Sequence, residues 1–127
     1  MSYRKEPKDW YRVDKFYNRI SPEKVGEVYA SCDILIKTSI LESFSYPPLE
    51  MMATGGVSVV VPNGGNVEYL KDGYNCLFYK QGDIEEGVAA VKKILDDKEL
   101  RDKLIKNGLK TARDYQWSNL EQQIIDI

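Results

Sequence analysis

The chain has 127 residues, a length that fits a single domain, and its 43% hydrophobic and 30% charged residues are typical of a folded globular protein. The net charge of -2 comes from well-mixed acidic and basic residues, which gives no indication of a basic face for binding nucleic acid. There is no histidine, so Ser-His-Asp and Cys-His catalysis within this chain are excluded and a transition-metal site is disfavoured.

Neither a membrane-spanning segment nor a disulfide framework is expected. No apolar run approaches the roughly 20 residues that span a bilayer, and no signal-peptide pattern opens the chain, so we expect a cytoplasmic protein. The two cysteines, Cys32 and Cys76, are too few and too far apart for a disulfide framework or a zinc site. Both have apolar neighbours, which predicts two buried free thiols.

The first elements in chain order are a short strand, a helix and a buried strand. Residues 13–17 favour the short strand. Ser21 and Pro22 are typical of an N-cap and a first helical position, and the apolar spacing that follows continues the helix to about residue 31. Residues 33–38 contain Ile-Leu-Ile, a short apolar run of the kind buried between helices in a parallel sheet.

The middle of the chain predicts one helix and two more strands. Two prolines start a helix at residue 47, and Gly55-Gly56 end it. Residues 57–61, nearly all valine, favour a buried strand, and residues 76–79 favour another after an Asp72-Gly73 turn. Between these strands, residues 67–70 are expected to make one helical turn.

From Asp83 onward the pattern is helical. One amphipathic helix is expected after Asp83, a second helix begins around residues 100–105, and a last amphipathic segment is expected over 118–125. Strands alternating with helices predict an α/β fold with a parallel sheet. Three or four strands are fewer than the roughly five or six of a mean sheet, so the sheet is expected to be incomplete.

The segment 39–50 carries the chemistry. It leaves the carboxyl end of a predicted strand, where ligands bind in open α/β sheets, and the free amides at the following helix start favour a phosphate. Glu50 is expected in the first helical turn, where its carboxylate can accept hydrogen bonds from the paired hydroxyls of a sugar. Taken without the rest of the sequence, Glu50 is more often only a favourable first-turn residue, and Glu42 only a solvated loop charge.

A second loop, residues 62–68, follows the valine strand directly. Gly64 and Gly65 allow a backbone to approach a ligand closely, although Asn-Gly-Gly alone is more often a plain turn. Two loops with a glutamate and small residues therefore leave successive strands on the same side. By contrast, the residues 72–75 are interpreted as a structural turn rather than a site.

Together these segments resemble glycosyltransferase family 4 of the GT-B fold, over roughly residues 13 to 120. The pattern is a buried strand, a serine, two glutamates with seven residues between them, and an E-x-M-A-x-G helix. The residues that match it in type and spacing are Asp33, Ser39, Glu42, Phe44, Pro48, Glu50, Met52, Ala53 and Gly55, followed by Gly64-Gly65-x-x-Glu68, Asp72-Gly73-x-Asn75, Gly82-Asp83 and Trp117-Ser118.

The resemblance implies a Rossmann-like parallel sheet flanked by helices, a truncated C-terminal half of a GT-B fold. Residues 1–127 would form a single, partial nucleotide-sugar-binding domain, with the N-terminal acceptor domain absent. The implied function is donor binding in a retaining glycosyltransferase that moves a sugar to an acceptor hydroxyl, in polysaccharide or glycolipid synthesis. The isolated chain would be inactive, because the basic residues that clamp the diphosphate have no match here.

The resemblance also assigns site residues. Glu42 would lie by the donor sugar as the catalytic residue, and Glu50 would hold the ribose hydroxyls. The remaining donor-binding residues implied are Ser43, Phe44, Ser45, Tyr46, Gly64 and Gly65. Ser43 and Ser45 stand where the family usually has glycine, which narrows the space for the sugar. The implied partner is a nucleotide-sugar such as a UDP- or GDP-sugar, with no cofactor and no metal, and the parent enzyme can act at a membrane surface.

Two other classes stay open at this point. One is a non-catalytic sugar-nucleotide-binding module. The other is an interaction module that self-associates through an exposed sheet edge. An unrelated Rossmann dehydrogenase is disfavoured because no G-x-G-x-x-G follows a strand.

Overall fold

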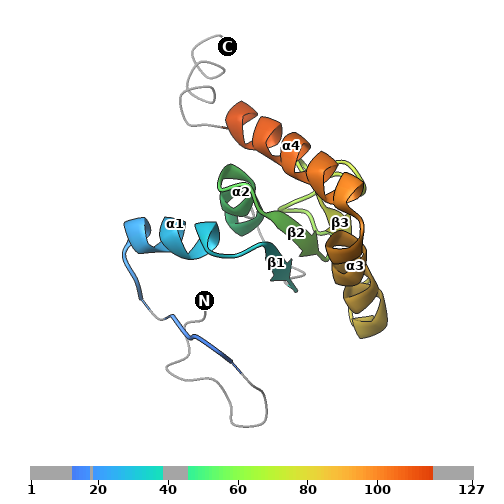
Figure 1. Ribbon diagram of the computed structural model, residues 1–127, viewed down its shortest axis with the longest axis horizontal. Coiled ribbons are helices and arrows are strands. Elements are labelled where there is room, and N and C mark those ends of the chain that lie inside the picture. The colour runs from blue at the N-terminus through green and yellow to red at the C-terminus, as the bar shows by residue number, and fades with distance from the viewer. Residues whose placement is uncertain (1–12, 18, 39–45, 116–127) are drawn as a thin grey trace.

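The computed structural model describes residues 13–17, 19–38 and 46–115, which form a small parallel sheet with helices on both faces (Figure 1). In chain order the elements are α1 (Pro22–Ala30), β1 (Ile34–Lys37), α2 (Tyr46–Ala53), β2 (Val57–Val60), β3 (Leu77–Phe78), α3 (Ile84–Asp96) and α4 (Lys98–Asp114). The expected α/β class is confirmed. Helices alternate with strands as far as β2, but β3 follows β2 through a loop, and α3 and α4 follow each other. The segment expected over 118–125 lies outside the described residues.

The sheet has the order β1-β2-β3, and each strand runs parallel to the next. Ile34 pairs with Val57 at one end of the β1–β2 ladder, and Lys37 pairs with Val60 at the other. All of β2 is buried, as expected of a central strand made almost wholly of valine. Within the described part of the chain, nothing pairs with the other edge of β1.

Alternate residues of β2 point to opposite faces of the sheet and build two apolar clusters. On one face, Val57 and Val59 pack with Ile94 of α3. On the other face, Val60 packs with Met52 of α2. Helix α4 contributes to both clusters, Leu104 to the first and Ala112 to the second.

The helix boundaries follow local signals in the sequence. At the start of α1 the Ser21 hydroxyl accepts the Lys24 N–H at 3.4 Å, and Pro22 occupies the first turn, as predicted. Helix α2 ends at Ala53, just before Gly55, which has a φ of 83°, and the Gly56 N–H donates to the Met51 carbonyl at 3.0 Å. Asp97 ends α3 and also caps α4, where its side chain accepts the Leu100 N–H at 3.0 Å.

Two expectations from the sequence are wrong. Residues 13–17 do not form a strand, because an isolated extended segment gains no ladder hydrogen bonds and no described strand lies beside it. Cys32 is exposed rather than buried, since α1 ends just before it and contributes no buried residue to the core. Cys76 is buried, as expected.

The long loop between β2 and β3 is held from inside by Asn75, which is 1% exposed. Its amide nitrogen donates to the Tyr69 carbonyl at 2.8 Å and to the Thr111 hydroxyl at 3.0 Å, and its oxygen accepts the Lys71 N–H at 2.9 Å. Thr111 belongs to α4, so this one side chain attaches the loop to the last described helix. The interpretation of residues 72–75 as structural is therefore confirmed.

Among the described helices, none combines the length and the apolar character that crossing a bilayer requires. The same part of the chain holds no group of three or more acidic or thiol side chains placed to share a metal ion.

Candidate functional site

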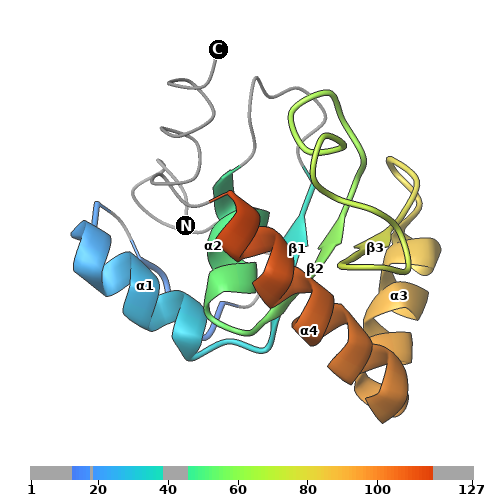
Figure 2. The same cartoon turned by 90° about the horizontal axis from the view of Figure 1, so that it is seen from above.

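The candidate site lies at the carboxyl edge of the sheet and along the helix that begins there. Since β1 and β2 are parallel neighbours, the connections that leave them start at the same edge, and α2 runs back from that edge (Figure 2). The turn containing Gly64 and Gly65 leaves β2 at this edge too. The sequence-based expectation that both loops emerge on one side is confirmed for the strands that carry them.

Four of the predicted site residues, Glu42, Ser43, Phe44 and Ser45, lie outside the described residues. The structure describes the other four, Tyr46, Glu50, Gly64 and Gly65. Tyr46 is the first residue of α2 and is 61% exposed. The surroundings of these four described residues determine which groups of a ligand each can contact.

Glu50 lies beyond the first turn of its helix, because the helix begins one residue earlier than the sequence predicts. Helix α2 begins at Tyr46, so Pro47 and Pro48 occupy its first turn, where prolines remove no helical hydrogen bond. The first turn therefore contains no acidic residue, which corrects the expected placement of Glu50. The helix dipole stabilises negative charges mainly in the first turn. It therefore does not account for the carboxylate of Glu50, which lies beyond that turn.

A groove between α1 and α2 accounts for the position of Glu50. It has a volume of about 450 Å³, within the range of small-molecule sites, and its walls are mainly apolar. Glu50 projects into it as the one charged side chain of the lining. The lining residues are Ile20, Pro22, Val25, Gly26, Tyr29, Glu50, Ala53 and Thr54.

Tyr29, in the last turn of α1, meets Glu50 across this groove. The two side chains line the same groove, and the carboxylate lies near enough to act on the phenol. Burial of the phenol, and then the negative charge and hydrogen bond of Glu50, raise the pKa of Tyr29 to about 12. The phenol therefore keeps its proton at neutral pH.

The glycine turn after β2 is organised by two asparagines. The Gly65 N–H donates to the Asn63 side-chain oxygen at 2.8 Å, and the Asn63 N–H donates to the Asn66 oxygen at 2.9 Å. The Asn66 amide in turn donates to the Val61 carbonyl at 3.0 Å. Gly65 is buried with its amide engaged, whereas Gly64 is exposed with open space around it.

The described site residues therefore fall into two groups. Glu50 lines the groove between α1 and α2, together with Tyr29, which the sequence analysis had assigned only to the apolar spacing of its helix. Tyr46, Gly64 and Gly65 are not part of that lining. No local signal identifies Tyr29, because its contact with Glu50 arises from the packing of α1 on α2.

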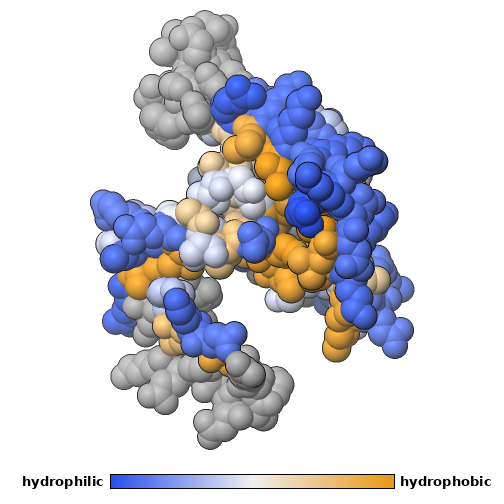
Figure 3. Space-filling view, in the orientation of Figure 1, coloured by the Kyte–Doolittle hydropathy of each residue, from blue (hydrophilic) through white to orange (hydrophobic). Residues whose placement is uncertain are grey.

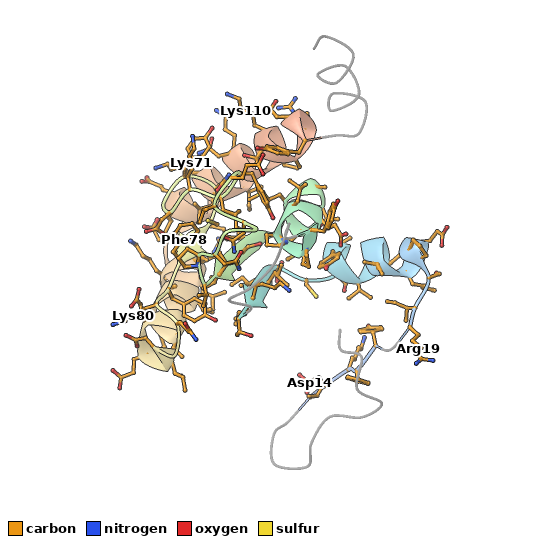
Figure 4. The ribbon with its side chains drawn as sticks, turned by 180° about the vertical axis from the view of Figure 1, so that it is seen from behind. Asp14, Arg19, Lys71, Phe78, Lys80 and Lys110 are labelled. Carbon is orange, nitrogen blue, oxygen red and sulfur yellow. The ribbon has the colours of Figure 1, made fainter. Side chains whose placement is uncertain are left out.

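Basic side chains that could hold a diphosphate do not gather at this groove. Figure 4 shows Lys71, Lys80 and Lys110 on the side of the molecule away from α1. Lys71 and Lys110 line a separate polar pocket of about 200 Å³ beside α4, and Glu68 of the second loop lies there too. The groove as described offers a carboxylate, a phenol and apolar walls.

Comparison with known proteins places this arrangement in a family. A family model described as "Glycosyl transferases group 1" matches residues 14–111. The chain is 26% identical over 115 residues to D-inositol 3-phosphate glycosyltransferase of a Nocardioides species, a match that covers 91% of this chain and 25% of that protein. The chain thus spans about a quarter of the length of the curated relatives it matches.

Solved structures share the fold. Anabaena HepE in complex with UDP has a TM-score of 0.73 and 24% identity, covering 79% of this chain and 28% of that one. Sucrose-phosphate synthase of Thermosynechococcus elongatus has a TM-score of 0.79 and 22% identity, covering 88% of this chain and 28% of that one. The parallel sheet and its helices are those of GT-B glycosyltransferases, and the chain belongs to the glycosyl transferases group 1 family.

Proposed function

We propose that this chain is the donor-binding portion of a retaining glycosyltransferase of family 4, which moves a sugar from a nucleotide-sugar to an acceptor hydroxyl in polysaccharide or glycolipid synthesis. The observation that carries the proposal is Glu50, which is the one charged residue lining a mainly apolar groove of about 450 Å³. The chain spans about a quarter of the length of its curated relatives. The sugar transfer by the whole protein is therefore proposed together with donor binding by this chain.

The groove suits a nucleoside. An ionised carboxylate only accepts hydrogen bonds, and its two oxygens can accept from the two neighbouring hydroxyls of a ribose. The apolar walls, including Ile20 and Val25, offer a surface for the planar base. In this arrangement Glu50 recognises the ribose, and α1 contributes the side of the groove that contacts the base.

The remaining chemistry belongs to the segment between β1 and α2. Glu42 would lie by the donor sugar, and the amides of residues 43–46 would approach the sugar and the diphosphate at the start of α2. Oriented amides and the helix N-terminus would stabilise the negative charge on the departing diphosphate. Gly64, with its exposed backbone, is positioned after β2 to contribute from the second loop. No metal is required in this scheme.

The donor nucleotide is proposed to be a uridine diphosphate sugar. Anabaena HepE, which shares the fold, has been solved with UDP and with UDP-glucose. A GDP-sugar is the alternative that a binding experiment has to compare.

Calorimetric titration of the purified chain with UDP, UDP-glucose and GDP tests the proposal. We expect saturable binding by the folded chain, lost in Glu50→Ala. The matched control is Glu27→Ala, which removes an exposed α1 carboxylate that pairs with Lys24 at 3.2 Å, outside the groove lining. Binding that survives in Glu50→Ala, or is lost equally in Glu27→Ala, would count against the ribose role of Glu50.

Self-association is a second candidate role, favoured by an apolar surface at the edge of the sheet where no described strand pairs with β1. Ile36 of β1 is 56% exposed, although its neighbour in the ladder, Val59, is fully buried. Ile36 lines an apolar groove of about 460 Å³ with Ile84 and Val88 of α3. Figure 3 shows apolar surface over the centre of the molecule, where β1 lies, bordered by the hydrophilic side chains of α3 and α4.

The occupant proposed for this surface is a second copy of the chain, because an exposed strand edge beside an apolar groove favours pairing with another edge. Light scattering should then give a mass that rises with concentration, and Ile36→Lys should return the chain to a monomer. A constant monomer mass in the unmodified chain would remove this candidate.

A further inference from the structure

A second cavity lies at the amino edge of the sheet, away from the candidate donor site. Its volume is about 320 Å³, within the range of small-molecule sites. Its lining includes the starts of β1 and β2 and residues of α3 and α4. Because β1 and β2 are parallel, this edge is opposite to the one at which their following loops begin. The cavity shares no lining residue with the groove that contains Glu50.

Arg101 of α4 brings a positive charge into this cavity, and the end of α3 fixes its direction. Its Nη1 donates to the Ile94 carbonyl at 3.1 Å and to the Leu95 carbonyl at 3.2 Å. A guanidinium has five N–H donors in a planar fork, and within the described part of the chain Nε and Nη2 have no acceptor. A held guanidinium with spare donors is suited to bidentate pairing with a carboxylate.

Asp33 brings a negative charge to the same cavity. Its backbone carbonyl accepts the Val57 N–H at 3.1 Å, which attaches this residue to the start of β2. Its carboxylate forms neither a hydrogen bond nor an ion pair with any residue that the structure describes. Asp33 and Arg101 therefore line one cavity without neutralising each other, and the carboxylate is available to a cationic group of a ligand.

The rest of the lining is mainly apolar. Val57 is fully buried in the core, and Ile34 and Ile105 pack against the same core cluster. Leu95, at the end of α3, is 57% exposed. Covering Leu95 with an apolar group removes hydrophobic surface from water, which favours a ligand with an apolar body.

We propose that this cavity binds a small zwitterion with an apolar side chain, of the class of the apolar α-amino acids. The ligand's carboxylate pairs with the guanidinium fork of Arg101, and its ammonium group pairs with the carboxylate of Asp33. Its side chain lies against Ile34, Leu95 and Ile105. The inference goes beyond donor binding and does not depend on it, because the two sites have no residue in common.

The two opposite charges make the site selective for a zwitterion. A ligand that covers the cavity displaces water from both charged side chains. An analogue that lacks one charge then leaves the matching side chain without a partner, and a charged group without a partner is costly beside apolar walls. Recognition therefore requires the carboxylate, the ammonium group and the apolar side chain together.

Calorimetric titration of the purified full chain tests this inference with four compounds. Leucine carries all three features. Leucinamide lacks the carboxylate, 4-methylpentanoate lacks the ammonium group, and glycine lacks the apolar side chain. The comparison uses only the unmodified protein, so it does not depend on whether any variant folds.

Two variants locate the binding in this cavity. Asp33→Asn removes the negative charge, and Arg101→Lys keeps the positive charge but loses the planar fork. The matched controls are Asp102→Asn and Arg113→Lys, which change exposed residues of α4 outside the lining of the cavity. Circular dichroism establishes that each variant is folded before it is titrated.

We expect saturable binding of leucine by the unmodified chain. Each of the three analogues, and each of the two cavity variants with leucine, should bind about tenfold more weakly or worse, as expected for the loss of a hydrogen bond to a charged group or of the apolar contact. The two control variants should bind leucine as the unmodified chain does.

Three results would overturn the inference. The first is a folded, unmodified chain that gives no saturable binding of leucine. The second is binding of leucinamide or 4-methylpentanoate that is as tight as that of leucine, since it would show that one of the two charges is not used. The third is unchanged leucine binding in both folded cavity variants, which would place the ligand elsewhere on the chain.

Discussion

Substitution of Asn75 by alanine should weaken the attachment of the β2–β3 loop to α4 and destabilise the chain. The Asn75 side chain makes three hydrogen bonds, to the Tyr69 carbonyl at 2.8 Å, the Thr111 hydroxyl at 3.0 Å and the Lys71 N–H at 2.9 Å. It is 1% exposed, so water does not take over these partners without rearrangement. Alanine removes all three bonds at once and leaves a cavity beside Tyr69.

The expected cost comes from the partners that stay behind. The buried Tyr69 carbonyl loses its side-chain donor, at about 1–3 kcal/mol, and the part-buried Lys71 N–H adds a cost near the lower end of that range. The Thr111 hydroxyl keeps an acceptor for its proton, the Asn107 carbonyl at 2.9 Å, so its loss is small. The sum is a loss of about 2–4 kcal/mol.

Urea denaturation followed by circular dichroism measures this loss, and thermal denaturation should show a midpoint lower by about 8–16 °C, at roughly 4 °C per kcal/mol. The control is Asn107→Ala, which removes one part-buried bond to the Tyr74 carbonyl at 2.9 Å and gains helix propensity, for a net change within about 1 kcal/mol. A loss of unfolding free energy below about 1 kcal/mol in Asn75→Ala, or an equal loss in both variants, would refute this estimate.

Three further predictions concern single side chains. Iodoacetamide should modify exposed Cys32 readily but Cys76 only in denaturant, as counted by mass spectrometry, because burial and then the charge of Asp72 raise the pKa of Cys76 to about 12. Stability should fall as the pH rises from about 10 to 12, because Tyr29 loses its proton near its ordinary pKa of 10.0 when unfolded but only near a pKa of about 12 when folded. In urea titrations over this pH range, Tyr29→Phe should lack the part of the stability loss that comes from Tyr29. Ser58→Ala should stabilise the chain by up to about 1 kcal/mol in the same assay, because the buried Ser58 hydroxyl has no hydrogen-bond partner in the part of the chain that the structure describes, and a clear loss would reveal a missed partner.

Features set by neighbouring residues could be predicted from the sequence. The start of α1 follows from Ser21 and Pro22, and the end of α2 follows from Gly55, since each signal acts within one helical turn. The valine run gives a buried central strand because few other structures accommodate consecutive β-branched residues so well. The parallel pairing of β1 and β2 follows from the helix between them, whereas β2 and β3 are joined by a loop without a helix.

Features set by packing could not be predicted. The contact of Tyr29 with Glu50 depends on how α1 lies against α2, which no local pattern encodes. Residues 13–17 have the composition of a strand, but a strand also needs a partner. The role of the Asn63 side chain in holding Gly65 was likewise hidden, because a glycine pair alone indicates a turn without showing which amides that turn uses.

Helix α4 contributes side chains to the clusters on both faces of the sheet, and this has a consequence for synthesis of the chain on the ribosome. It is the last described element to emerge, so Leu104 and Ala112 reach their places only after every strand has been made. Until then the nascent chain presents Val57 and Met52 to solvent, a surface that chaperones recognise. Ribosome-bound chains that end before Lys98 should therefore be protease-sensitive throughout, and protection should arise in one step once α4 is free to dock.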